Sequence, residues 1–103
     1  MNLAAPLAVE NTATIIIDMQ QRLLAAMHER ERLLRNVVKL IGGCQVLEIP
    51  IILTEQYPKG LGPTVPEIKG LLTDIRPVEK LSFNCCDEEA FLQALQALGR
   101  RQL

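Results

Sequence analysis

Apolar residues along the chain follow two different periods, and each period predicts one type of element. Residues 13–17, Ala-Thr-Ile-Ile-Ile, form a continuous run rich in β-branched side chains, which is typical of a strand buried on both faces. Residues 49–54 form a second such run, with Pro50 near its start, where a missing N–H disturbs a strand least. A third, shorter strand is predicted over residues 75–80.

Two helices are predicted by apolar spacings of three and four. The first extends from Leu33 onward, and its apolar face consists of Leu34, Val37, Val38, Ile41, Cys44 and Leu47. The second begins at Asp87, because Glu88 and Glu89 then lie in the first turn, where the helix dipole favours acidic side chains. It ends at Gly99, and its buried stripe consists of Phe91, Leu92, Leu95 and Leu98.

The order of these elements predicts the fold class. Residues 55–66 are rich in proline and glycine and predict a long loop, and residues 67–72 predict a short helical turn. The resulting order, β-α-β-loop-β-α, favours an α/β fold with a parallel sheet and right-handed crossovers. Residues 99–103 resemble the turn out of a helix and the first residues of a further strand, so we interpret the chain as truncated after the third strand–helix unit.

Composition limits the classes of partner. Hydrophobic residues make up 49% and aromatic residues 3%, so the predicted core is aliphatic. Charged residues make up 22% with a net charge of −1, which favours neither a nucleic acid nor an anionic membrane surface as partner. No apolar run approaches the roughly 20 residues of a membrane span. A small molecule or another protein is the expected partner.

The number and spacing of the cysteines indicate the cellular compartment in which the protein is expected. Cys44, Cys85 and Cys86 form an odd set with two adjacent members, which is a poor disulfide framework and favours a reducing cytoplasm. Cys44 falls on the apolar face of the first helix and is expected to be a core residue.

Three ionisable residues are predicted at the carboxyl ends of the strands, where open parallel sheets bind ligands. Asp18 ends the first strand, Glu55 the second and Lys80 the third. Each also has a structural interpretation: a helix N-cap for Asp18, a loop-ordering carboxylate for Glu55 and a solvated surface side chain for Lys80. Their convergence on one edge of the sheet favours a functional site.

Three segments resemble a known family. Residues 15–20 (Ile-Ile-Ile-Asp-Met-Gln), residues 50–64 and residues 79–83 (Glu-Lys-Leu-Ser-Phe) are similar to the isochorismatase-like cysteine hydrolases. The Thr-Glu-Gln-Tyr-Pro segment at residues 54–58 is particularly similar to the isochorismatase domain-containing subgroup. The resemblance extends over residues 13–103. It implies a three-layer α-β-α Rossmann-like fold, of which residues 1–103 would be the N-terminal portion of a single domain.

The resemblance also implies an Asp-Lys-Cys triad. Asp18 matches the aspartate that accepts the thiol proton, and Lys80 matches the lysine that stabilises the thiolate. The thiolate would attack an amide or a related bond of a small molecule. In the family, the nucleophilic cysteine follows the next strand, so this chain is expected to lack it and to be inactive alone. Cys85 and Cys86 are expected to be inert or partly buried thiols.

The resemblance carries further expectations for the pocket. Leu24, Glu55 and Tyr57 are candidate substrate-pocket residues, although a core role for Leu24 is equally plausible. The loop around Tyr57 is either a pocket and subunit contact or a rigid connection stiffened by proline. The family commonly forms homo-oligomers, so we expect one here. An alternative function is a non-catalytic α/β binding or protein-interaction module that uses this loop.

No metal and no cofactor are expected. Related nicotinamidases carry an aspartate and two histidines for a divalent ion near the second strand. Here that place holds Glu55, Gln56 and Tyr57, and the single histidine, His28, lies in a charged stretch expected to be exposed. Motifs for a dinucleotide or a phosphate loop are also missing from the sequence.

Overall fold

A computed structural model describes residues 5–103 of the protein. Its sheet has the strand order β1-β2-β3, with β1 over Thr14–Ile17, β2 over Ile51–Gln56 and β3 over Val78–Lys80. Both pairings are parallel, and Thr54 lies opposite Ile17 on one side and Val78 on the other. The α/β class and the parallel sheet are therefore confirmed.

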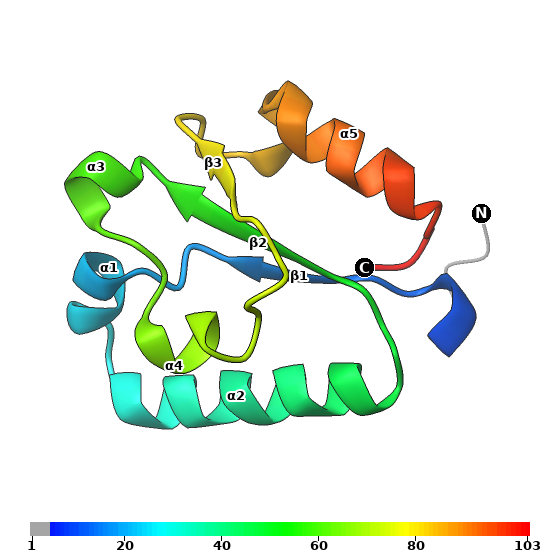
Figure 1. Ribbon diagram of the computed structural model, residues 1–103, viewed down its shortest axis with the longest axis horizontal. Helices are drawn as coiled ribbons and strands as arrows, with labels where there is room; N and C mark the ends of the chain where they lie inside the picture. The colour runs from blue at the N-terminus through cyan, green and yellow to red at the C-terminus, as the bar shows by residue number, and fades with distance from the viewer. Residues whose placement is uncertain (1–4) are drawn as a thin grey trace.

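The helices lie on both sides of this sheet. Figure 1 shows α2 (Arg30–Val46) and α4 (Pro66–Lys69) below the sheet and α5 (Glu89–Leu98) above it. Two short helices, α1 (Gln21–Ala25) and α3 (Pro58–Leu61), follow the carboxyl ends of β1 and β2. Two 3₁₀ turns, η1 (Val9–Asn11) and η2 (Cys85–Asp87), complete the elements. Across residues 5–103, every helix is too short or too polar to cross a membrane.

The segment predicted as a long loop is more regular than expected. Strand β2 continues through Glu55 to Gln56, and α3 follows it inside the predicted loop. Helix α4 begins at the last loop residue and overlaps the helical turn predicted over residues 67–72. Pro58 and Pro66 are the first residues of these helices, a position where proline fits because its missing N–H would have no helical partner. The prolines that suggested a loop therefore mark helix starts. The last helix begins at Glu89 rather than Asp87, because η2 precedes it.

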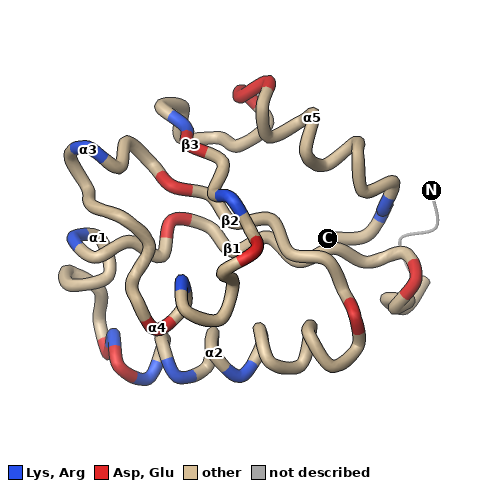
Figure 2. The backbone as a smooth tube through the Cα atoms, in the orientation of Figure 1, with Lys and Arg blue, Asp and Glu red and all other residues tan. Residues whose placement is uncertain are grey.

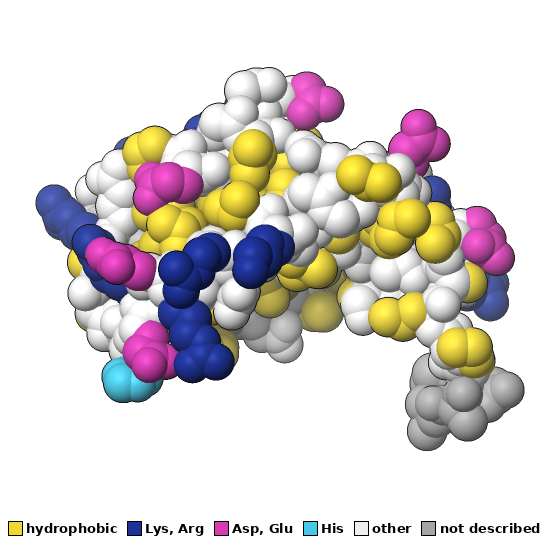
Figure 3. Space-filling view, turned by 90° about the horizontal axis from the view of Figure 1, so that it is seen from below, with side chains coloured by type: hydrophobic (Ala, Val, Ile, Leu, Met, Phe, Trp, Pro, Cys, Tyr) yellow, Lys and Arg dark blue, Asp and Glu magenta, His cyan; other side chains and the backbone are white. Residues whose placement is uncertain are grey.

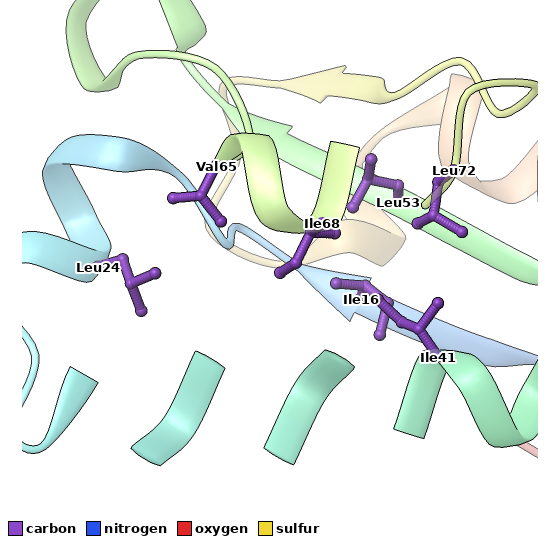
Figure 4. Packing of buried hydrophobic residues seen from close by; sticks show 7 residues of the cluster. All are labelled: Ile16, Leu24, Ile41, Leu53, Val65, Ile68 and Leu72. Carbon is purple, nitrogen blue, oxygen red and sulfur yellow. The ribbon is translucent and has the colours of Figure 1, made fainter. Parts of the chain in front are cut away.

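The core lies between one face of the sheet and helices α2 and α4 (Figure 4). Its buried members are aliphatic, as the composition predicts: Ile16, Leu24, Ile41, Leu53, Val65, Ile68 and Leu72. Cys44 is buried at 4% exposure, with its sulfur 3.2 Å from the Thr14 hydroxyl, which confirms its core position.

Two glycines differ in the change of stability that we expect when alanine replaces them. Gly99 ends α5 at φ +64°, a left-handed conformation that disfavours other residues, whereas Gly43 lies inside α2 with open space around it. We expect Gly99→Ala to destabilise the chain by about 1 kcal/mol, and Gly43→Ala to stabilise it by about 1 kcal/mol. Urea unfolding measures the change in the free energy of unfolding for each variant. Two changes of the same sign would contradict the helix assignments.

The last residues of the chain run beside residues 11–13, which lead into β1, on the edge that β2 does not occupy. The Ala13 N–H donates to the Gln102 carbonyl at 2.9 Å, and the Gln102 N–H donates to the Asn11 carbonyl at 2.9 Å. Thr12 and Gln102 form a parallel bridge. The end of the chain therefore lies parallel to the residues that lead into β1.

Candidate functional site

Asp18 follows β1 directly and turns its carboxylate toward the neighbouring strands. Its backbone is left-handed, at φ 55°, a conformation that aspartate tolerates better than most residues. The Thr54 hydroxyl donates to Oδ1 at 2.8 Å, and Lys80 Nζ lies 3.1 Å from Oδ2. The N-cap of the following helix is Gln20, so the structure does not support the N-cap interpretation of Asp18.

Lys80 is buried, with a side-chain exposure of 1%, so the surface-lysine interpretation is wrong. Burying an ammonium is costly unless oxygen atoms surround it. Four oxygens lie within hydrogen-bonding distance of Nζ: Gln56 Oε1 at 2.7 Å, Phe83 O and Asp18 Oδ2 at 3.1 Å, and Ser82 O at 3.2 Å. The side chain therefore orders the loop after β3 and holds the Asp18 carboxylate.

The central strand β2 supplies one polar partner for each member of this pair. Thr54 and Gln56 are two residues apart, so their side chains point to the same face of the strand. Thr54 contacts Asp18 from β1, and Gln56 contacts Lys80 from β3. Neither residue was predicted from the sequence, because Thr54, Glu55 and Gln56 are consecutive polar residues and their order alone does not say which of them face Asp18 and Lys80.

Gln20 is a further residue that the sequence analysis left without a role. Its side chain is completely buried. Its Nε2 donates to the Gln56 carbonyl at 2.9 Å and to the Gly62 carbonyl at 2.8 Å, and its Oε1 accepts from the Gln56 N–H at 2.7 Å. The amide thus fixes the end of β2 against the following loop.

The three candidate pocket residues lie in different places. Glu55 Oε2 accepts from the Thr64 N–H and hydroxyl, both at 2.7 Å, on the side of β2 opposite Gln56, which matches its loop-ordering interpretation. Leu24 is 4% exposed and belongs to the core. Tyr57 is half exposed and lines an open pocket of about 450 Å³ together with Lys80.

Asp18 lies on a second and larger groove, of about 980 Å³, which runs along β1. Cys85 and Cys86 also line this groove; Cys85 is partly buried and Cys86 is exposed. The Asp18–Lys80 pair therefore lies between two open spaces. Within residues 5–103, no three His, Cys, Asp or Glu side chains gather closely enough to hold a metal ion, and His28 is exposed.

Glu88 fixes the loop that surrounds Lys80 from outside. The backbone N–H of Ser82 and then that of Leu81 donate to its Oε1, at 2.8 and 2.9 Å, and these bonds hold the pKa of Glu88 below its ordinary value. A lowered folded-state pKa means that the carboxylate stabilises the fold at neutral pH. This contribution is lost as the pH falls through the lowered pKa.

We therefore expect acid to weaken the wild type more than a Glu88→Gln variant. The urea midpoints of the wild type and of the variant should differ most at about pH 7 and should converge toward about pH 3, because the protonated carboxyl of Glu88 resembles the amide of glutamine. A difference that stays constant over this range would contradict the proposed role of the Glu88 carboxylate.

The fold and the site define a class of α/β protein that has a parallel sheet and a carboxylate–ammonium pair at the carboxyl edge of that sheet. The isochorismatase domain model matches residues 12–103, and the chain belongs to this family. Among curated relatives, isochorismatase domain-containing protein 2 of Danio rerio is 35% identical over 96 residues, covering 93% of this chain and 47% of the relative. Isochorismatase domain-containing protein 2A of Mus musculus is 35% identical over 75 residues, covering 73% of this chain and 35% of the relative.

Solved structures show the same fold. The YcaC gene product of Escherichia coli, described as an octameric hydrolase of unknown specificity, is 29% identical with a TM-score of 0.90, covering 100% of this chain and 52% of that one. The MAR1 ribonuclease of Caenorhabditis elegans is 31% identical with a TM-score of 0.80, covering 89% and 48%. YcaC of Pseudomonas aeruginosa, with hexane-2,5-diol and covalent acrylamide, is 27% identical with a TM-score of 0.83, covering 100% and 53%. The chain spans about half the length of the solved proteins it matches.

Proposed function

We propose that this chain supplies the aspartate and the lysine of a cysteine hydrolase that acts on an amide or related bond of a small molecule. The observation that carries the proposal is the 3.1 Å contact between Lys80 Nζ and Asp18 Oδ2 at the carboxyl edge of the sheet. A nearby ammonium stabilises a thiolate, and a carboxylate within reach accepts the thiol proton. The nucleophilic thiol comes from outside residues 1–103.

The residues act in a simple order. Asp18 takes the proton from the thiol, and the thiolate forms a bond to the substrate carbonyl carbon. The protonated Asp18 then donates to the leaving nitrogen as the carbon–nitrogen bond breaks. Water next attacks the thioester with Asp18 as the base, which releases the acid and restores the thiol. Backbone N–H groups would stabilise each oxyanion.

Lys80 can accommodate a thiolate by exchanging one contact. An ammonium has three hydrogens, and four oxygens already surround Nζ. The Ser82 carbonyl, at 3.2 Å, is the most distant of them. The three hydrogens are therefore shared among four oxygens, and a thiolate that takes one hydrogen from the two loop carbonyls leaves the bonds to Asp18 and Gln56 in place, so the pair stays oriented during the reaction.

The acrylamide adduct of a solved relative supports thiolate chemistry. YcaC of Pseudomonas aeruginosa carries covalent acrylamide. Acrylamide is an electrophile to which thiolates add readily, and the thiolate rather than the thiol is the reactive form of cysteine. We propose that the site to which this chain contributes reacts in the same way.

A small-molecule substrate is favoured over RNA, although one relative is described as a ribonuclease. Figure 2 shows acidic and basic residues interleaved along the chain, and Figure 3 shows lysine and arginine side chains among aspartate and glutamate on one face. With a net charge of −1 and acidic side chains beside the basic ones, this distribution favours a small molecule over the many phosphate contacts of an RNA. Because one relative is an octamer, we also propose that the whole protein is a homo-oligomer. We propose in addition that it is cytoplasmic and that it uses no cofactor.

The test is a chimera in which residues 1–103 replace the matched half of Pseudomonas aeruginosa YcaC. We expect acrylamide to modify the chimera, and we expect Lys80→Met to slow this modification at neutral pH by at least about 10-fold, because one opposite charge shifts a thiol pKa by about one unit or more. Lys39→Met, at an exposed lysine on α2 that does not line the pocket of Lys80, is the matched control. A folded Lys80→Met chimera that reacts at the control rate would favour the non-catalytic binding module instead.

A further inference from the structure

Tyr57 has a strained backbone beside Lys80. It follows β2 with φ 39° and ψ 66°, a left-handed conformation that is rare for a bulky residue. Its N–H donates to the Lys80 carbonyl at 2.9 Å, which ties Tyr57 to the end of β3. Backbone strain of this kind costs free energy, persists where the surrounding structure enforces it, and is concentrated at functional sites. We therefore expect the surrounding structure to hold the Tyr57 side chain in one position.

The ring of Tyr57 packs against Gly60, three residues later in α3. A Cβ added at Gly60 would lie 2.6 Å from Cδ2 of the ring and still closer to Cε2, well inside the roughly 3.5–4.0 Å at which carbon atoms pack. Arg22 Nη1 donates to the Gly60 carbonyl at 2.7 Å and so holds this residue in place. Because Gly60 has a helical backbone, alanine fits the main chain there, and its methyl group would displace the ring. Gly60 therefore sets the position of the Tyr57 ring.

The half-exposed Tyr57 ring forms a wall of the 450 Å³ pocket that Lys80 also lines. Pro58 and Leu81 add apolar surface to this pocket, and Leu81 is 75% exposed. The formal charges of the other lining residues cancel: Lys59, Lys80, Glu79 and Glu88. A pocket with an aromatic wall and no net charge favours a flat, uncharged group, because aromatic rings pack well against each other.

We propose that Tyr57 is a specificity-determining residue of the hydrolase and that Gly60 is its positioning residue. The pocket takes a flat, uncharged ring of the substrate against the Tyr57 ring, with the amide that is cleaved toward Lys80. The orientation of the amide rests on the proposed function, whereas the binding of the ring does not. Gly60 acts through Tyr57 alone, because the missing Cβ leaves the space that the ring occupies.

The first experiment titrates the chain with acetanilide, an unreactive amide that carries a flat, uncharged ring, and follows binding by NMR. Tyr57 is the single tyrosine, so its ring signals report on the pocket directly. We expect these signals to shift, and we expect Gly60→Ala to raise the dissociation constant by at least about 5-fold. Gly42→Ala, in open space on α2, is the matched control and should bind like the wild type.

Three results of this titration would overturn the proposal. The first is that the Tyr57 signals do not shift, and the second is that the two glycine variants bind alike. The third is that benzylammonium, which carries the same ring and a positive charge, binds more tightly than acetanilide, since the site would then select a cation.

The second experiment compares N-phenylacrylamide with acrylamide as reagents for the chimera with Pseudomonas aeruginosa YcaC. The ratio of the two rate constants is insensitive to a general loss of reactivity, so a merely structural role of Gly60 would leave this ratio unchanged. We expect Gly60→Ala to lower the ratio by at least about 5-fold and Tyr57→Phe, which keeps the ring, to preserve it. Adding Gly60→Ala to Tyr57→Ala should lower the ratio no further, because Gly60 acts through the ring.

The two experiments separate this proposal from the proposed function. A chimera that acrylamide does not modify counts against the proposed function, and acetanilide binding to the chain then decides the roles of Tyr57 and Gly60. A chimera that acrylamide modifies, but whose ratio is the same in Gly60→Ala and Gly42→Ala, overturns the specificity role and retains the proposed function.

Discussion

Replacing Lys80 with methionine is expected to lower the free energy of unfolding by about 2–3 kcal/mol. The substitution keeps most of the side-chain volume but removes a buried ammonium that contacts Gln56, two loop carbonyls and Asp18. Breaking a fully buried ion pair costs about 3–5 kcal/mol, and the expected loss is smaller here because the Asp18 side chain is 20% exposed and keeps some contact with water.

Urea unfolding monitored by circular dichroism measures this loss. Lys59→Met is the matched control, because Lys59 is exposed on α3 and its replacement should change the stability by less than about 0.5 kcal/mol. Equal stability of the two variants would mean that the ammonium of Lys80 orders nothing, contrary to the contacts described above.

Replacing Gln20 with leucine is expected to cost about 3 kcal/mol, because three backbone groups lose a buried partner at about 1 kcal/mol or more each. These groups are the N–H and carbonyl of Gln56 and the carbonyl of Gly62. Gln21→Leu, at the exposed neighbouring residue, is the control and should change the stability by less than about 0.5 kcal/mol.

The Gln20 variant has a second expected consequence. Gln56 carries the oxygen closest to Lys80 Nζ, at 2.7 Å, so a displaced end of β2 should also disturb the Asp18–Lys80 pair. We therefore expect Gln20→Leu to slow acrylamide modification of the chimera, whereas Gln21→Leu should leave it unchanged. A destabilised variant with unchanged reactivity would limit Gln20 to a purely structural role.

The sequence predicts the main layers of the fold because they follow from local periodicity. The β-branched runs locate β1 and β2, and the apolar spacing of three and four locates α2. Helix α3 is missed, and α4 is expected only as a short turn over residues 67–72, because helices of four residues have little intrinsic stability and depend on tertiary contacts. Their prolines and glycines resemble those of a loop.

The site is predictable only in part, for a related reason. Asp18 and Lys80 come together because parallel strands end at one edge, which the order of elements already implies. Glu55 lies next to Gln56 in the sequence, but alternation along β2 sends their side chains to opposite faces. Sequence alone does not say which face meets Lys80, so the roles of Thr54, Gln56 and Gln20 require the three-dimensional register.

The measurement that tests the central claim most directly is a double-mutant cycle on Asp18 and Lys80. Asp18→Asn, Lys80→Met and the double variant would be compared with the wild type by urea unfolding; asparagine keeps an oxygen for the Thr54 hydroxyl. We predict a coupling of about 1–2 kcal/mol between the two sites, as for side chains in direct contact. Effects that add to within about 0.3–0.5 kcal/mol would mean that the carboxylate and the ammonium do not interact, and the proposed site would lose its basis.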